Sequence, residues 1–244
     1  MPDRQERKSA ALGNSETIDE LRDYGLRIIQ PRDGYRFSLD PVILSDFVDV
    51  REGERVIDFG TGCGIVPLIL ARKSTGTSFV GVEFQETLVG LARRNVQLNG
   101  LQARIEIVAG DILHLRGIFP ADSFDIVTAN PPYRVPGTGR TSPRPGRDAA
   151  RHETTAGLAD FVEMGKRLVK SGGRICLVYH VSRLAELFAE AERQRLTPLR
   201  IRFVHGSEGA EARMFLLELV KGKKGEIRVL PPLFVSDDDR GKEK

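Results

Sequence analysis

The chain has few cysteines and no long apolar run. Its 244 residues include only two cysteines, Cys63 and Cys176, which lie far apart and lack the spacing of metal ligands. This scarcity predicts a reduced, cytoplasmic protein without a metal site or disulfide bonds. Charged residues interrupt the longest apolar runs well before the roughly 20 residues that a membrane-spanning helix needs, so we expect no membrane segment.

The N-terminus also lacks the apolar core of a signal peptide. We expect residues 1–17 to form a disordered leader, and residues 236–244, which are acidic and then basic, to form a mobile tail. The sequence between them is long enough to bury the core of one domain, since 40% of the chain is hydrophobic. The net charge of +3 is too small to identify a partner, and the placement of the arginines says more.

Short apolar segments alternate with helical segments from residue 55 onward. We predict strands at residues 55–59, 78–82, 105–109, 124–129 and 174–179. Helices are predicted after Gly64 and at residues 86–98, 157–170 and 182–195. Two further strands, at 199–204 and 213–220, have no helix between them and should pair antiparallel at the sheet edge. The pattern predicts an α/β fold, a mostly parallel seven-stranded sheet with that antiparallel edge pair and with helices on both faces.

The segment before this domain predicts a hairpin and a helix. Residues 26–30 and 35–37 flank the turn-forming sequence Pro31-Arg32-Asp33-Gly34, which suggests two paired strands. Ser38 and Pro41 are typical of a helix start. The simplest interpretation of residues 18–50 is an N-terminal cover on the core.

A glycine-rich turn follows the first predicted strand of the main domain. Gly60, Gly62 and Gly64 allow a tight turn that a ligand can approach closely. Glu83 follows Gly64 by 19 positions, about the distance at which an acidic residue binds ribose hydroxyls in nucleotide-binding folds. Asp58 lies just before the turn, where a carboxylate disfavours a pyrophosphate. Physical chemistry therefore favours S-adenosylmethionine, which carries an ammonium and a sulfonium, over a dinucleotide, which remains an open alternative.

The sequence Asn130-Pro131-Pro132-Tyr133 ends the strand predicted at 124–129. Two prolines cannot continue a strand, so the chain must enter a rigid, extended loop there. In open α/β sheets, ligands bind at the carboxyl ends of the strands. The alternative is an ordinary tight turn that terminates the strand.

These motifs together resemble the class I S-adenosylmethionine-dependent N-methyltransferases. The resemblance depends on residues 58–64, Glu83, Gly110-Asp111 and Asn130-Pro131-Pro132-Tyr133, in that order. Flanking sequences at 30–40, 150–153 and 231–233 are similar to the bacterial tRNA1(Val) (adenine N6)-methyltransferase family, which modifies the adenine 3′ of the anticodon. The resemblance covers residues 18–235. It implies a Rossmann-like class I methyltransferase fold, with residues 51–235 as the methyltransferase domain and residues 18–50 covering the cofactor pocket.

The resemblance implies S-adenosylmethionine as the cofactor and assigns its contacts. Glu83 would hold the ribose hydroxyls, Asp111 the adenine amino group and the glycine turn the methionine end. Phe84 and Ile112 would pack on the adenine faces, and Asp40 would close the pocket near the methionyl group. The expected cofactor-binding residues are Asp40, Asp58, Gly60, Gly62, Gly64, Glu83, Phe84, Asp111, Ile112 and Asn130. Structural alternatives remain open, since Glu83 could be a solvated carboxylate and Asp111 a helix cap.

The expected catalytic residues are Asn130, Pro131 and Tyr133. The Asn130 side-chain oxygen and the Pro131 carbonyl would accept hydrogen bonds from an adenine amine, while Tyr133 would stack on a base that has left its own stack. The nitrogen becomes strongly acidic once it is methylated, so we expect no dedicated general base and assign none to His152 or His180.

The segment from residue 134 to residue 151 contains five arginines. They are expected to contact RNA phosphates: Arg134, Arg140, Arg144, Arg147 and Arg151. An ordinary solvated loop is the alternative. We expect a monomeric enzyme that acts on tRNA. Three other functions remain open: a protein glutamine methyltransferase, an rRNA or DNA amino-methyltransferase, and an RNA-binding module with a vestigial cofactor pocket.

Overall fold

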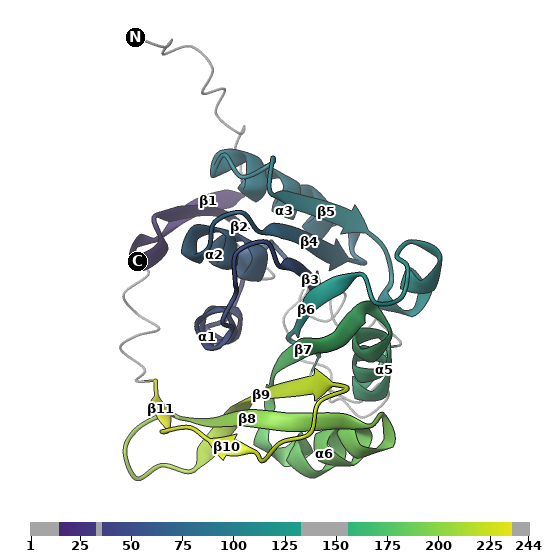
Figure 1. Cartoon of the computed structure of the whole chain (residues 1–244). Coiled ribbons are helices and arrows are strands. Elements are labelled where there is room, and N and C mark those ends of the chain that lie inside the picture. Colours follow the sequence, from purple (N-terminus) through teal and green to yellow (C-terminus); the bar gives the residue numbers. More distant parts are fainter. Residues whose placement is uncertain (1–14, 33–35, 133–155, 236–244) are drawn as a thin grey trace.

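A twisted sheet forms the centre of the computed structural model, which describes residues 15–32, 36–132 and 156–235 (Figure 1). Five neighbouring strands run parallel, in the order β5-β4-β3-β6-β7, and two antiparallel strands, β9 and β8, extend the β7 side. The bounds are β3 Arg55–Phe59, β4 Ser78–Glu83, β5 Ile105–Ala109, β6 Phe124–Ala129, β7 Val169–His180, β8 Leu196–His205 and β9 Ala212–Lys221. The predicted α/β fold and its antiparallel edge pair are confirmed.

Two short strands lie beyond the seven that the sequence predicts. β10 (Arg228–Val229) and β11 (Leu233–Phe234) each pair in parallel with β8, so the described sheet has nine strands. A two-residue strand has no measurable apolar period, which explains why the sequence pattern does not reveal it.

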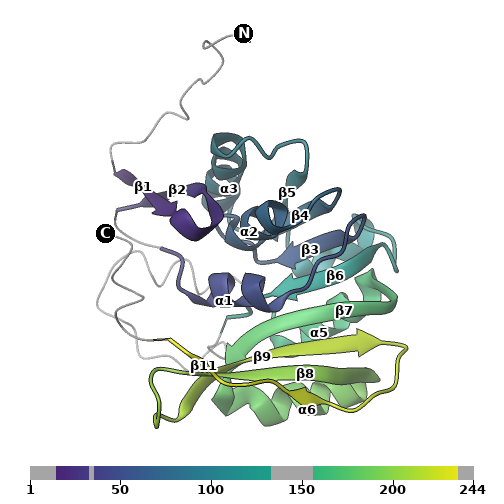
Figure 2. The ribbon, with the colours of Figure 1, turned by 60° about the vertical axis from the view of Figure 1, so that its left-hand side comes forward.

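Helices cover both faces of the sheet (Figures 1 and 2). One face packs against α1 (Asp40–Phe47), α2 (Ile65–Lys73) and α3 (Glu86–Leu98). The other packs against α5 (Leu158–Leu168), α6 (Leu184–Arg193) and the 3₁₀ helix η2 (Ile112–Gly117); a second 3₁₀ turn, η3 (Val181–Arg183), precedes α6. Neighbouring strand residues alternate between these two cores, as in Val56 and Ile57, because side chains of a strand alternate between its faces.

The N-terminal hairpin differs from the prediction. β2 (Leu26–Pro31) pairs antiparallel with the upstream strand β1 (Glu16–Leu21), through the 3₁₀ turn η1 (Arg22–Tyr24) and Gly25 at φ +60°. The predicted partner at 35–37 is wrong, since Phe37 lies outside any strand. The Pro-Arg-Asp-Gly sequence led to the wrong prediction, because the turn of the hairpin is formed by η1 and Gly25. Glu16 and Thr17 belong to β1 and not to the expected leader.

Several element boundaries also differ from the prediction, most of all between α5 and β7. The helix predicted at 157–170 ends at Leu168, and β7 begins at Val169, so Ser171-Gly172-Gly173 lies inside that strand. The β6–β7 register shifts between Phe124 and Ile126, opposite this glycine pair. In the described residues, no helix is long and apolar enough to cross a membrane. Most of the expected leader and the whole expected tail lie outside the described residues.

Candidate active site

The sheet register brings all four motifs to one edge. Phe59 pairs with Val82 of β4 and with Ala129 of β6, and Glu83 pairs with Ala109 of β5. The residues that follow these strand ends therefore lie side by side, on strands about 4.8 Å apart. β3 and β6 are the strands from which the chain order runs in opposite directions, and ligands of open α/β sheets bind at such a switch point.

The glycine turn after β3 is built from left-handed backbone. Gly60, Gly62 and Gly64 have φ values of +67°, +58° and +89°, which side chains disfavour. The Thr61 N–H donates to the Val82 carbonyl (2.9 Å), and the Gly64 N–H donates to the Thr61 carbonyl (2.9 Å). The turn thus folds back over β4 at the start of α2.

The Glu83 carboxylate is buried, with 5% of the residue exposed, and it supports this turn. Oε2 accepts the Gly62 N–H (2.9 Å) and Oε1 accepts the Gln85 N–H (2.9 Å). Burial raises the pKa of Glu83, while these backbone donors lower it. A carboxylate has about four acceptor sites, and the backbone of Phe84 is a third hydrogen-bond partner, so about one site remains for a further donor such as a hydroxyl. The alternative of a solvated Glu83 carboxylate is wrong.

Asp58 is the second buried carboxylate of the site, with 3% of the residue exposed. The Thr128 hydroxyl donates to its Oδ1 (2.7 Å) across the β3–β6 ladder. Burial raises the pKa of Asp58 to about 7, and the nearby Glu83 charge acts in the same direction. Among the described residues no lysine, arginine or histidine forms an ion pair with Asp58 or Glu83. Two buried carboxylates without an ion-pair partner suit a positively charged ligand, so these residues fit S-adenosylmethionine.

Asp111 follows the carboxyl end of β5, the last strand on this side of the sheet. The Asp111 side chain accepts the Leu113 N–H (2.9 Å) through Oδ1 and so caps η2, which was the structural alternative. Its Oδ2 lies 3.8 Å from His114 Nδ1. Ile112 is buried, whereas Phe84 is 41% exposed, which is unusual for a large apolar side chain and consistent with a face that a ligand covers.

The strand-ending motif is anchored from β7. The Tyr179 hydroxyl donates to the Pro132 carbonyl (3.3 Å), and Tyr179 is itself 1% exposed. Pro131 is buried and Asn130 is partly exposed. Tyr133 and the predicted RNA-binding residues Arg134, Arg140, Arg144, Arg147 and Arg151 lie outside the described residues. Asp40 is the first residue of α1, where Pro41 follows it as expected.

Sequence reasoning missed three residues that shape this edge: Asn95, Thr128 and Tyr179. Thr128 and Tyr179 each interrupt an apolar strand with a hydroxyl, and a buried hydroxyl needs a partner, so that signal was available. Asn95 of α3 and Asn99, which follows the last residue of that helix as its C-cap, are four positions apart, a spacing that places two residues on the same helix face. Among the described residues no group of three or more His, Cys, Asp or Glu side chains could hold a metal ion.

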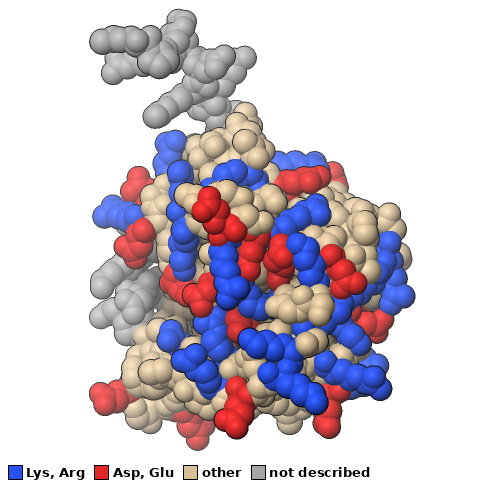
Figure 3. Space-filling view, in the orientation of Figure 1, with Lys and Arg blue, Asp and Glu red and all other residues tan. Residues whose placement is uncertain are grey.

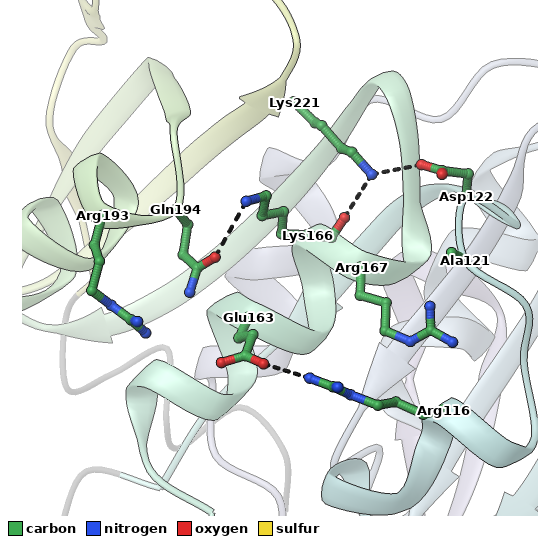
Figure 4. Close-up of a pocket in the computed structure, with 9 residues that line it drawn as sticks. All are labelled: Arg116, Ala121, Asp122, Glu163, Lys166, Arg167, Arg193, Gln194 and Lys221. Atoms are coloured by element: carbon green, nitrogen blue, oxygen red, sulfur yellow. Dashed lines mark hydrogen bonds and ion pairs between the residues drawn. The ribbon is translucent and has the colours of Figure 1, made fainter.

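Two hollows lie elsewhere on the surface. The first, of about 590 Å³, is lined by residues of α5, α6 and the ends of neighbouring strands, and Figure 4 shows that Lys221 meets Asp122 there while Arg116 meets Glu163. The second, of about 510 Å³, contains the ion pairs Arg174–Glu54 and Lys170–Asp125. In the view of Figure 3, Lys and Arg are more numerous over the part where β7, β8 and β9 lie, with acidic residues between them. Neither hollow includes a motif residue.

Comparisons with known proteins agree with this geometry. Residues 51–212 match the family described as "Methyltransferase domain". The chain is 31% identical to the tRNA1(Val) (adenine(37)-N6)-methyltransferase of Tolumonas auensis over 67% of each chain. It is 29% identical to the protein of the same name from Aeromonas salmonicida, over 79% of this chain and 81% of that one. The fold is similar to that of a predicted O-methyltransferase from Agrobacterium tumefaciens, with a TM-score of 0.65 and 22% identity over 80% of this chain and 86% of that one.

Proposed function

Because this chain belongs to the tRNA1(Val) (adenine(37)-N6)-methyltransferase family, we propose that it methylates N6 of an adenine in tRNA, the adenine 3′ of the anticodon in a valine tRNA. It is an S-adenosylmethionine-dependent methyltransferase with a class I fold. The observation that supports the proposal most is the register of the sheet. In that register β3, which leads into the glycine turn, lies between β6, which ends just before Asn130, and β4, which ends at Glu83.

The cofactor-binding part of the proposal follows this order of strands. Glu83 holds the ribose hydroxyls, and Phe84 and Ile112 contact the adenine ring, with Asp111 at its amino group. Asp58 supplies negative charge near the methionine end, where Gly60, Gly62 and Gly64 let the ligand approach the backbone. Residues 18–50 cover the pocket, with Asp40 near the methionyl group.

The methyl-transfer step depends on positioning. S-adenosylmethionine supplies an electrophilic sulfonium methyl group. The Asn130 side-chain oxygen and the Pro131 carbonyl accept the two N6 hydrogens, which orients the nitrogen lone pair toward that methyl. Tyr133 stacks on the flipped base, and such stacking contributes about 1–3 kcal/mol. Holding two reactants in the attack geometry can account for roughly 7–11 kcal/mol of a barrier.

Tyr179 contributes indirectly, since its hydroxyl fixes the carbonyl of Pro132, next to the residue whose own carbonyl is proposed to bind the amine. The arginines of the segment after Tyr133 hold the tRNA backbone. Such contacts are electrostatic and sequence-independent, so the choice of adenine depends on base flipping into the pocket.

Nucleoside mass spectrometry of tRNA tests this proposal. The wild-type protein, S-adenosylmethionine and a valine tRNA transcript should give N6-methyladenosine. A transcript with guanine in place of the adenine 3′ of the anticodon should give none, and Asn130→Ala should give at least about 100-fold less, as expected when a charge-developing centre loses its oriented partner. With labelled S-adenosylmethionine and separate tRNA and protein substrates, label found only in protein would overturn the proposal, as would label in neither substrate from a protein that binds the cofactor.

A further inference from the structure

The side chain of Asn95 connects the N-terminal hairpin to the glycine turn. Asn95 lies on α3 and is fully buried. Its Oδ1 accepts the Ile29 N–H (2.7 Å), and its Nδ2 donates to the Ile29 carbonyl (3.2 Å) and to the Cys63 carbonyl (3.0 Å). One amide thus satisfies the backbone of two segments that are more than thirty positions apart along the chain.

Asn99 repeats half of this arrangement one helical turn later. It accepts the Arg27 N–H (3.0 Å) and donates to the Arg27 carbonyl (2.7 Å). Four residues of helix rise about 6 Å, and two residues of strand span about 6.6–6.8 Å. Because these lengths match, the two asparagines take the place of a neighbouring strand along the edge of β2 that faces away from β1.

The glycine turn is consequently held from two sides. Glu83 binds the N–H of Gly62, and Asn95 binds the carbonyl of the next residue, Cys63. The turn is left-handed at three glycines, so its own backbone preference does not fix its shape. The hydrogen bonds of Glu83 with the Gly62 N–H and of Asn95 with the Cys63 carbonyl therefore determine the conformation of the turn that would contact the cofactor.

The hairpin has its own connection to α3 next to this contact. Arg94 binds the Glu16 carboxylate through two nitrogens, at 2.8 and 2.7 Å, which attaches β1 as well as β2 to the helix. Gln30 receives the Phe37 N–H (3.0 Å) and donates to Asp19 (2.6 Å), which ties the start of the following segment to the hairpin. Hairpin, α3 and glycine turn therefore form one hydrogen-bonded unit.

We propose that Asn95 is a positioning residue through which docking of the N-terminal hairpin and binding of S-adenosylmethionine are thermodynamically coupled. Ordering the glycine turn by the cofactor fixes the Cys63 carbonyl, which fixes the Asn95 amide and, through it, the Ile29 backbone. Linkage is reciprocal, so a docked hairpin strengthens cofactor binding by the same factor. The proposal depends on the cofactor alone and not on the identity of the methylated substrate.

Hydrogen exchange of the wild-type chain tests the coupling directly. The probe is S-adenosylhomocysteine, the demethylated product, which binds without turnover. Saturating probe should slow exchange of the Ile29 amide by about 10-fold, within the usual range for coupled sites. Unchanged exchange at Ile29, in a protein whose glycine-turn amides do become protected, would overturn the proposal.

Two matched variants separate positioning from general support of the fold. Asn95→Ala should raise the dissociation constant of S-adenosylmethionine about 10-fold and abolish the ligand-induced protection at Ile29. Asn99→Ala removes a similar pair of backbone contacts from the hairpin but does not touch the turn, so it should leave affinity and protection at Ile29 within about 2-fold of wild type. Equal effects of the two substitutions would contradict the proposal. If the wild-type protein shows the ligand-induced protection at Ile29 but does not methylate tRNA, the proposed substrate is wrong and the coupling proposal stands.

Discussion

The Thr128 hydroxyl lies 2.7 Å from the Asp58 carboxylate, and the two residues are direct partners in the parallel β6–β3 ladder. This hydrogen bond joins the strand that ends in Asn130 to the strand that enters the glycine turn. Hydroxyl hydrogen bonds to the carboxylate lower its pKa, but the loss of hydration on burial outweighs them and raises the pKa of Asp58 to about 7.

Cofactor affinity should depend on pH through Asp58. Below its pKa of about 7 the carboxyl group is protonated and loses its attraction for a positively charged ligand, so affinity should fall by up to about 10-fold per pH unit. Calorimetric titration with S-adenosylmethionine between pH 5.5 and pH 7.0 measures this.

The matched control is Asp58→Asn, which cannot ionise. Its affinity should vary less over the same range, and the dependence that remains reports Glu83, whose pKa is also raised. Parallel pH profiles for the two proteins would contradict the assignment of Asp58.

Stability without cofactor should fall as pH rises from about 4 to about 7. The folded pKa of Asp58, about 7, lies above its ordinary value of 3.8, so the folded protein holds a proton that the unfolded chain releases. Folding therefore loses up to about 4 kcal/mol between pH 4 and pH 7 from this group, and nothing more above its folded pKa. Urea unfolding of wild type and Asp58→Asn at several pH values checks the sign: the variant should be the more stable protein at pH 8.

Removing the charge of Glu83 should weaken cofactor binding by about 10- to 100-fold, because hydrogen bonds to charged groups contribute about 1.5–3 kcal/mol. Glu83→Gln has nearly the same size and can still accept the Gly62 N–H. The dissociation constant from calorimetry is the measurement, and Glu86→Gln, an exposed change at the start of α3, is the control. A variant that binds as tightly as wild type would exclude Glu83 from the ribose site.

Tyr179→Phe should lower the methylation rate without changing cofactor affinity. The substitution removes only the hydroxyl that holds the Pro132 carbonyl, and a neutral hydrogen bond contributes about 0.5–1.5 kcal/mol, so we expect a rate decrease of about 2- to 10-fold. Single-turnover methylation measures the rate. Tyr24→Phe removes a hydroxyl bound to Asp46 in the N-terminal region and should leave the rate unchanged.

Replacing Arg140, Arg144 and Arg147 together by alanine should weaken tRNA binding and flatten its salt dependence. Each lost phosphate contact should reduce the slope of log affinity against log salt by about 0.7–0.9. Fluorescence anisotropy at several salt concentrations measures both quantities. Arg22→Ala removes a well-exposed cation on the hairpin and serves as the control; an unchanged slope in the triple variant would place the RNA elsewhere.

Alternation of short apolar strands with helices was sufficient to predict the main domain. Its signal is strong because each parallel strand is buried on both faces and each helix must cover a face. Gly60, Glu83, Asp111 and Asn130 each lie at or just after the end of a predicted strand, and the ladder shows that these strands are neighbours in the sheet.

The hairpin and the supporting residues could not be predicted in the same way. The partner of β2 depends on tertiary contacts with α3, whereas the sequence offered a second turn signal at Pro31-Arg32-Asp33-Gly34. Asn95 and Tyr179 form hydrogen bonds with residues that are distant in the sequence, Cys63 and Pro132. The local pattern of apolar residues carries no information about such distant partners. For Asp111 the sequence could not separate a structural from a binding role, because one carboxylate can both cap η2 and contact a ligand.

β8 is bordered on its outer side by β10 and β11, each only two residues long. Without them, a row of peptide groups from Arg200 to His205 would be open to pairing with any extended chain, including another copy of this protein. β10 and β11 thus occupy part of this strand edge, and we expect truncation after Lys221 to expose it to strand pairing between molecules.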